Sequence, residues 1–105
     1  KKVFGATSVS HSAFTNKEIK KVAICGGSGA FLMNEAIRAE ADVFITGEAK
    51  YNDYYDVEGK ILLAVIGHYE SEVHTKQLIH NIISKKNPTF AAQLSNVNSN
   101  PVKYS

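Results

Sequence analysis

The chain has 105 residues with a single cysteine, two prolines, no tryptophan and a formal net charge of only +2. Because Cys25 has no partner within the chain, a disulfide framework and a paired-cysteine metal or redox motif are both excluded. A reducing, cytoplasmic location is therefore expected. The small and scattered net charge argues against nucleic-acid binding. No apolar run approaches the about 18 residues of a membrane span, so membrane insertion is not expected either.

The remaining composition is typical of a soluble globular protein, with 44% hydrophobic and 21% charged residues. The length suits a single domain with its own core, over residues 1–105. Hydrophobic patterning predicts five strands, at residues 3–14, 21–25, 43–46, 61–66 and 90–97.

Helices are predicted between these strands, at about residues 32–41 and about residues 68–86, with a short helix or ordered loop at residues 51–57. In the last helix the apolar residues Leu78, Ile79, Ile82 and Ile83 are expected on the inner face. Strands that alternate with helices predict an α/β fold, in which a mostly parallel or mixed sheet has helices on both faces. In such sheets ligands bind beyond the carboxyl ends of the strands.

A glycine-rich segment, CGGSGAF, follows the strand at residues 21–25. Glycines between a strand and a helix let backbone N–H groups approach an anion, so Gly26, Gly27, Ser28 and Gly29 are candidates for substrate or anion contact. A tight structural turn explains the same residues. The segment also nearly matches a G-x-S-x-G nucleophile elbow, which leaves open a serine hydrolase that uses Ser28. The Walker A and dinucleotide templates fail, because the residues they need after the last glycine are absent.

A second polar segment, Thr46-Gly47-Glu48, follows the strand at residues 43–46. Glu48 and Asn52 are candidates for orienting a metal ligand or a water molecule without binding the metal themselves. Capping of the following helix explains Glu48 equally well.

The third segment is ILLAVIGHYESE, in which a buried strand leads into His68 and Glu72 at the start of a helix. Residues at i and i+4 lie on one helix face, so the imidazole and the carboxylate converge on one point. Imidazole and carboxylate are common ligands of Zn, Fe, Mn and Ni, and we predict that His68 and Glu72 bind a divalent metal. The alternative is that both residues only stabilise the helix start. His11, His74 and His80 are interpreted as solvated or packed histidines.

Taken together, KKVAICGGSGAFL, ADVFITGEAKYND, LLAVIGHYESE and the closing NSNPVKY resemble the C-terminal part of the Nif-three-like family, of the YbgI/YqfO type, often named GTP cyclohydrolase 1 type 2 homologues. The resemblance covers nearly the whole chain, and GH-x-x-[ST]-E after a hydrophobic strand is a fairly specific signature. Many relatives carry histidine where this chain has Asn52.

This resemblance implies two related α/β halves that hold a dinuclear metal centre between them. It implies metal ligands at His68 and Glu72, with two divalent ions in the complete site and the other ligands in an N-terminal half of the same protein. It also implies a homo-oligomer, a toroidal hexamer in the family. The leading hypothesis is therefore the C-terminal portion of a dinuclear-metal protein, with metal-dependent hydrolysis as its candidate reaction. A non-catalytic metal-binding or assembly module is the alternative, because no residue stands out as a general acid or base.

Overall fold

The computed structural model describes all residues from Lys1 to Ser105. The chain consists of two compact units, Lys1–Glu72 and Val73–Ser105. The single domain predicted over residues 1–105 stays a prediction.

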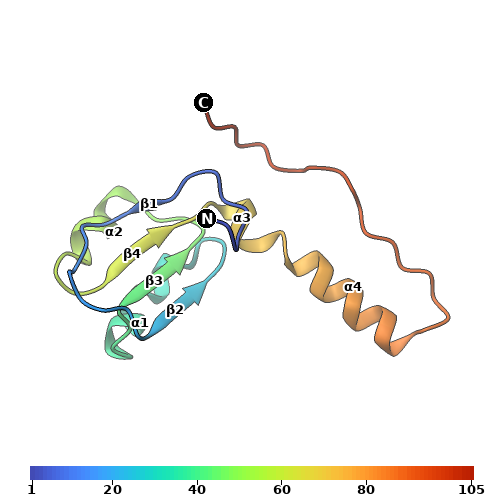
Figure 1. The fold of residues 1–105 in the computed structure, drawn as a ribbon, viewed down its shortest axis with the longest axis horizontal. Helices are drawn as coiled ribbons and strands as arrows, with labels where there is room; N and C mark the ends of the chain where they lie inside the picture. Colours follow the sequence, from blue (N-terminus) through green and yellow to red (C-terminus); the bar gives the residue numbers. More distant parts are fainter. The chain divides into compact units, whose positions relative to one another are not determined.

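The first unit contains a four-stranded mixed sheet in the order β1-β4-β3-β2 (Figure 1). Its strands β2 (Val22–Cys25), β3 (Val43–Thr46) and β4 (Leu62–Val65) run parallel, and the short β1 (Ser10–His11) pairs antiparallel with β4. Between the strands lie a 3-10 helix η1 (Gly29–Leu32), α1 (Met33–Arg38) and α2 (Tyr51–Asp56), and α3 (His68–Glu72) follows β4. This arrangement confirms the predicted α/β class with a parallel or mixed sheet.

The core lies on one face of this sheet. Phe44 and Leu63 point from β3 and β4 toward Met33 and Ala36 of α1 and toward Val57, which follows α2. Phe44 is 2% exposed and Leu63 is fully buried. On the opposite face, strand β2 exposes Val22 and Ile24. On the same face Val43 of β3, which pairs with Val22, is buried.

Residues 3–14 do not form the predicted long strand. Only Ser10 and His11 pair with β4, and Val3 and Phe14 at the two ends of the segment are exposed. The β-branched and small residues of this segment favour extended backbone, but a strand also needs a neighbouring strand along its length. Here that neighbour exists for two residues only.

The second unit contains α4 (Thr75–Lys86) and the segment that follows it. The predicted helix at residues 68–86 is thus two helices, α3 and α4. The predicted strand at residues 90–97 is wrong, because this segment pairs with no strand. It contacts α4 instead, where His80 Nε2 lies 3.2 Å from the Ala92 carbonyl oxygen and Lys76 Nζ donates to the Ser95 carbonyl oxygen. The apolar residues Leu78, Ile79, Ile82 and Ile83 were expected inside and are exposed.

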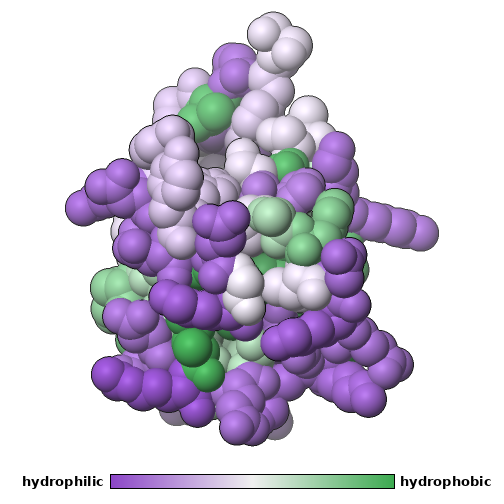
Figure 2. All heavy atoms as spheres, turned by 90° about the vertical axis from the view of Figure 1, so that its left-hand side faces the viewer, coloured by the Kyte–Doolittle hydropathy of each residue, from purple (hydrophilic) through white to green (hydrophobic).

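None of the helices combines the length and the hydropathy that a membrane span requires. The face drawn in Figure 2 is mostly hydrophilic, and its apolar residues form separate patches rather than one continuous surface.

Candidate functional site

The parallel register of the sheet brings three loops to one edge. Cys25 of β2 is paired with Thr46 of β3, and Thr46 is paired with Val65 of β4. Because the strands are parallel, the loops that follow them emerge at the same edge. The glycine loop (residues 26–29), the Gly47–Glu48 pair and the start of α3 therefore lie together.

Glycine at two positions allows these loops to touch. A Cβ atom at Gly47 would lie 2.5 Å from Ser71 Oγ and 2.8 Å from the Gly27 carbonyl oxygen, so a side chain has no room there. The Gly27 backbone has a φ of +59°, which favours glycine, and a Cβ atom there would lie 2.5 Å from Glu72 Oε1. The backbone N–H groups of Gly47 and Glu48 both donate to the Gly27 carbonyl oxygen, at 3.0 Å each.

Helix α3 is attached to the glycine loop by Ser71. Its hydroxyl donates to the His68 carbonyl oxygen at 2.8 Å and accepts a hydrogen bond from the Gly27 N–H at 2.9 Å. Sequence reasoning assigned no role to Ser71, although it occupies the serine or threonine position of the GH-x-x-[ST]-E signature. A hydroxyl at this position fixes the helix that carries both predicted metal ligands.

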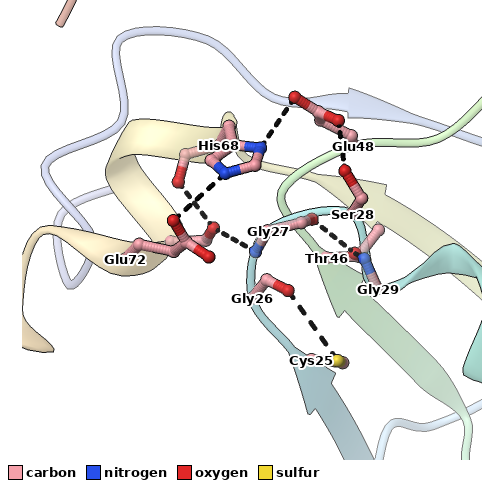
Figure 3. A network of polar contacts seen from close by, with 10 residues as sticks. Cys25, Gly26, Gly27, Ser28, Gly29, Thr46, Glu48, His68 and Glu72 are labelled. Carbon is pink, nitrogen blue, oxygen red and sulfur yellow. Dashed lines mark hydrogen bonds and ion pairs between the residues drawn. The ribbon is translucent and has the colours of Figure 1, made fainter.

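His68 lies between two carboxylates (Figure 3). Its Nδ1–H donates to Glu48 Oε1 at 2.7 Å, and its Nε2 lies 3.1 Å from Glu72 Oε2. The Ser28 hydroxyl donates to the other Glu48 oxygen, Oε2, at 2.6 Å. The three charged side chains are about half exposed, at 47% for His68 and 54% for each glutamate, so the cluster is open to solvent.

The two carboxylates change the acidity of the ring. The hydrogen bond to Glu48 raises the pKa of His68 above its ordinary value of 6.5, and the negative charges of Glu72 and Glu48 act in the same direction. The hydrogen bond from Ser28 lowers the pKa of Glu48, and the hydrogen bond from His68 lowers it further. Glu48 therefore stays ionised at neutral pH, and His68 holds its proton to a higher pH than a free imidazole.

Ser28 does not contact an imidazole. A serine nucleophile needs its hydroxyl to donate to a histidine that acts as base. In this structure the Ser28 hydroxyl donates to a carboxylate, and that carboxylate contacts His68. The order of contacts is thus serine, glutamate, histidine, so the hydroxyl does not have the imidazole base that a serine-histidine pair requires.

The glycine loop uses two of its amides within the protein. The Gly27 N–H donates to Ser71 Oγ, and the Gly29 N–H donates to Thr46 Oγ1 at 3.2 Å. These bonds explain the loop as a structural turn that joins β2, β3 and α3. An anion bound at the loop would have to meet the amides of Gly26 and Ser28 instead.

Other predicted residues lie apart from the cluster. Asn52 is exposed on α2 and has no hydrogen bond or ion pair with His68, Glu48 or Glu72. His11 bonds to the neighbouring Ser12 carbonyl oxygen, and His80 contacts Ala92 within the second unit.

An open cavity of about 580 Å³ adjoins the cluster through Ser28 and Glu48. Its other lining residues are Ala30, Phe31, Ala49, Lys50 and Asp53. The cavity beside the polar cluster is thus lined by small side chains, one aromatic ring and charges of both signs.

The separation of His68 Nε2 from Glu72 Oε2 fits a shared divalent ion. Zinc binds imidazole nitrogen and carboxylate oxygen at about 2.0–2.2 Å, so two such ligands in tetrahedral geometry lie roughly 3.4 Å apart. The observed distance of 3.1 Å would have to increase only slightly for both atoms to bind one ion. The chain has no group of three or more His, Cys, Asp or Glu side chains placed to hold a metal ion by themselves.

Curated relatives share this sequence over most of the chain. The protein named GTP cyclohydrolase 1 type 2 homolog of Staphylococcus epidermidis is 35% identical over 108 residues, which cover 99% of this chain and 30% of that protein. The protein of the same name from Archaeoglobus fulgidus is 39% identical over 74 residues, which cover 70% of this chain and 30% of the relative. The chain thus spans about 30% of the length of these relatives.

Solved structures show the same fold. The crystal structure of Staphylococcus aureus protein SA1388 matches with a TM-score of 0.81 and 31% identity, over 97% of this chain and 34% of that one. A Bacillus cereus protein related to NIF3 matches with a TM-score of 0.78 at 18% identity, over 99% of this chain and 30% of that one. The family model described as Duf34/NIF3 (NGG1p interacting factor 3) matches residues 1–101. The chain therefore belongs to the Duf34/NIF3 family.

Proposed function

We propose that this chain supplies His68 and Glu72 to a dinuclear divalent-metal centre. The observation that carries the proposal is the convergence of His68 Nε2 and Glu72 Oε2, 3.1 Å apart on a half-exposed surface at the carboxyl edge of the sheet. Close approach of a nitrogen lone pair and a carboxylate oxygen is favourable only when a cation lies between them. In the doubly protonated ring the Nε2 proton has this position, and a metal ion would replace that proton while Nδ1 keeps its own.

The remaining ligands come, in this proposal, from an N-terminal half of the same protein. Stable zinc sites have at least three protein ligands, whereas this chain brings together only one suitable pair. The relatives are about three times as long as the matched region, which leaves room for a second half. Assembly into a homo-oligomer, as the family resemblance implies, belongs to the same proposal.

Metal-dependent hydrolysis is the reaction class that we propose for the complete centre. A dinuclear site polarises the substrate and lowers the pKa of a bound water, which makes hydroxide available at neutral pH. The relatives named GTP cyclohydrolase 1 type 2 homolog support hydrolysis as the reaction class. Within this chain, the role of His68 and Glu72 is to bind the metal, and the adjoining cavity is the place for a substrate.

Calorimetric titration of the metal-stripped chain with Zn²⁺ tests the proposal. Weak binding is expected, because only two ligands are present, and it should disappear in His68→Ala and in Glu72→Ala. The control His11→Ala should bind as the unchanged chain does, because His11 lies outside the cluster. Lower pH should weaken binding, because the metal competes with a proton for His68, and Glu48 and Glu72 raise the pKa of His68.

Two results would contradict the proposal in different ways. Tight stoichiometric binding by the chain alone, abolished by His68→Ala, would show that the site is complete without a second half. Equal binding by all four proteins would show that the metal binds elsewhere.

A further inference from the structure

We propose that Glu48 is a positioning residue that makes Nε2 the metal-facing nitrogen of His68, and that Ser28 holds Glu48 in this role. This inference rests on the proposed function, because it assigns a purpose to the orientation of one of the proposed ligands. Neither residue touches the metal position itself. Both act through the opposite side of the imidazole ring.

The two ring nitrogens have unequal partners. Nδ1 lies 2.7 Å from Glu48 Oε1, whereas Nε2 lies 3.1 Å from Glu72 Oε2. A neutral imidazole has a single N–H, and the hydrogen bond at one nitrogen determines where that proton resides. The shorter contact to Glu48 therefore keeps the proton on Nδ1. The lone pair is left on Nε2, where it faces Glu72.

Glu48 is itself held at three points. Its backbone N–H donates to the Gly27 carbonyl oxygen, its Oε2 accepts the Ser28 hydroxyl, and its Oε1 accepts the His68 ring. A half-exposed glutamate normally samples many rotamers. Holding it in one of them therefore has a considerable entropic cost. Here both carboxylate oxygens have partners from different loops, so the side chain has one arrangement that satisfies all of them.

This arrangement is suited to metal binding. Metal-ligating histidines commonly donate their other N–H to a carboxylate, which fixes the tautomer and makes the ligand nitrogen more basic. Loss of such a partner typically costs about 10–100-fold in metal affinity. Since Ser28 and Glu48 also line the adjoining cavity, a molecule that enters the cavity would contact the pair that orients the ligand.

The tautomer can be measured without any metal. The ¹⁵N resonances of the His68 ring, recorded in the metal-free chain at a pH where the ring is neutral, should show the Nδ1–H form. In Glu48→Ala they should move toward the Nε2–H form that free histidine prefers. Glu48→Gln should retain the Nδ1–H form, because its amide oxygen can still accept. Glu35→Ala, which removes an exposed carboxylate on α1, is the matched control and should change nothing. An unchanged tautomer in Glu48→Ala would overturn the inference.

Zinc affinity provides the second measurement. Glu48→Ala should weaken Zn²⁺ binding by about 10–100-fold and Ser28→Ala by less than about 10-fold, since serine acts only through Glu48. If His68→Ala abolishes binding while Glu48→Ala binds as the unchanged chain does, the positioning role is overturned and the metal site stands. If His68→Ala binds Zn²⁺ as the unchanged chain does, the proposed function fails. The tautomer measurement alone then decides whether Glu48 determines the tautomer of the His68 ring.

Discussion

A chimaera that completes the site is expected to bind Zn²⁺ at least about 100-fold more tightly than the isolated chain. In this chimaera the present sequence replaces the matched 108-residue region of the Staphylococcus epidermidis relative, which is 35% identical to it. Loss of a residue that only supports a metal ligand already costs about 10–100-fold, so a gain of further ligands should exceed that range. Calorimetric titration of the metal-stripped chimaera measures the affinity.

The chimaera also tests where the ligands lie. His68→Ala within it should remove most of the gained affinity, whereas His11→Ala should retain it. A folded chimaera that binds Zn²⁺ no more tightly than the isolated chain would rule out the split ligand set.

Phe44→Ala is expected to lower the free energy of unfolding by about 3–5 kcal/mol, the usual cost of removing a large aromatic side chain from a packed core. Phe44 is 2% exposed at the centre of the cluster that joins β3, β4 and α1. Native domains have a total stability of about 5–15 kcal/mol, so this loss is a large fraction of the whole. The midpoint of urea denaturation, followed by circular dichroism, measures the change.

Phe31→Ala is the matched control for this experiment. Phe31 is 78% exposed, so its removal should change stability by no more than about 0.5 kcal/mol. A similar loss in both variants would show that the buried cluster around Phe44 is not the centre of the core.

Sequence patterning found the parallel strands and failed at both ends of the chain. The short apolar runs before Gly26, Gly47 and Gly67 gave β2, β3 and β4 to within about one residue. Parallel strands are typically continuous apolar runs, and this holds here even for β2, which lies at the sheet edge and exposes Val22 and Ile24. Residues 3–14 and 90–97 have strand-like composition but almost no neighbouring strand in this chain. Composition reports what a segment favours, whereas a strand exists only where a partner is present.

The candidate site was predictable in part for a similar reason. His68 and Glu72 are four residues apart, and helix geometry alone brings them together. The Ser28–Glu48–His68 chain joins three loops that are distant in sequence, and it depends on the pairing of Cys25 with Thr46 and of Thr46 with Val65. Sequence spacing does not specify that register. The same holds for Ser71, whose role follows only from its contact with Gly27.

The most direct test of metal ligation by His68 and Glu72 is nuclear magnetic resonance of the isotopically labelled, metal-stripped chain with Zn²⁺ in excess. Excess metal populates a weak site, so low affinity does not hide it. We predict that the His68 Nε2 and Glu72 carboxylate resonances shift most, with smaller shifts at Gly27 and Ser71, and that His11, His74 and His80 do not respond. Unchanged His68 and Glu72 resonances at saturating Zn²⁺, with shifts centred on another histidine, would contradict the assignment of these residues as metal ligands.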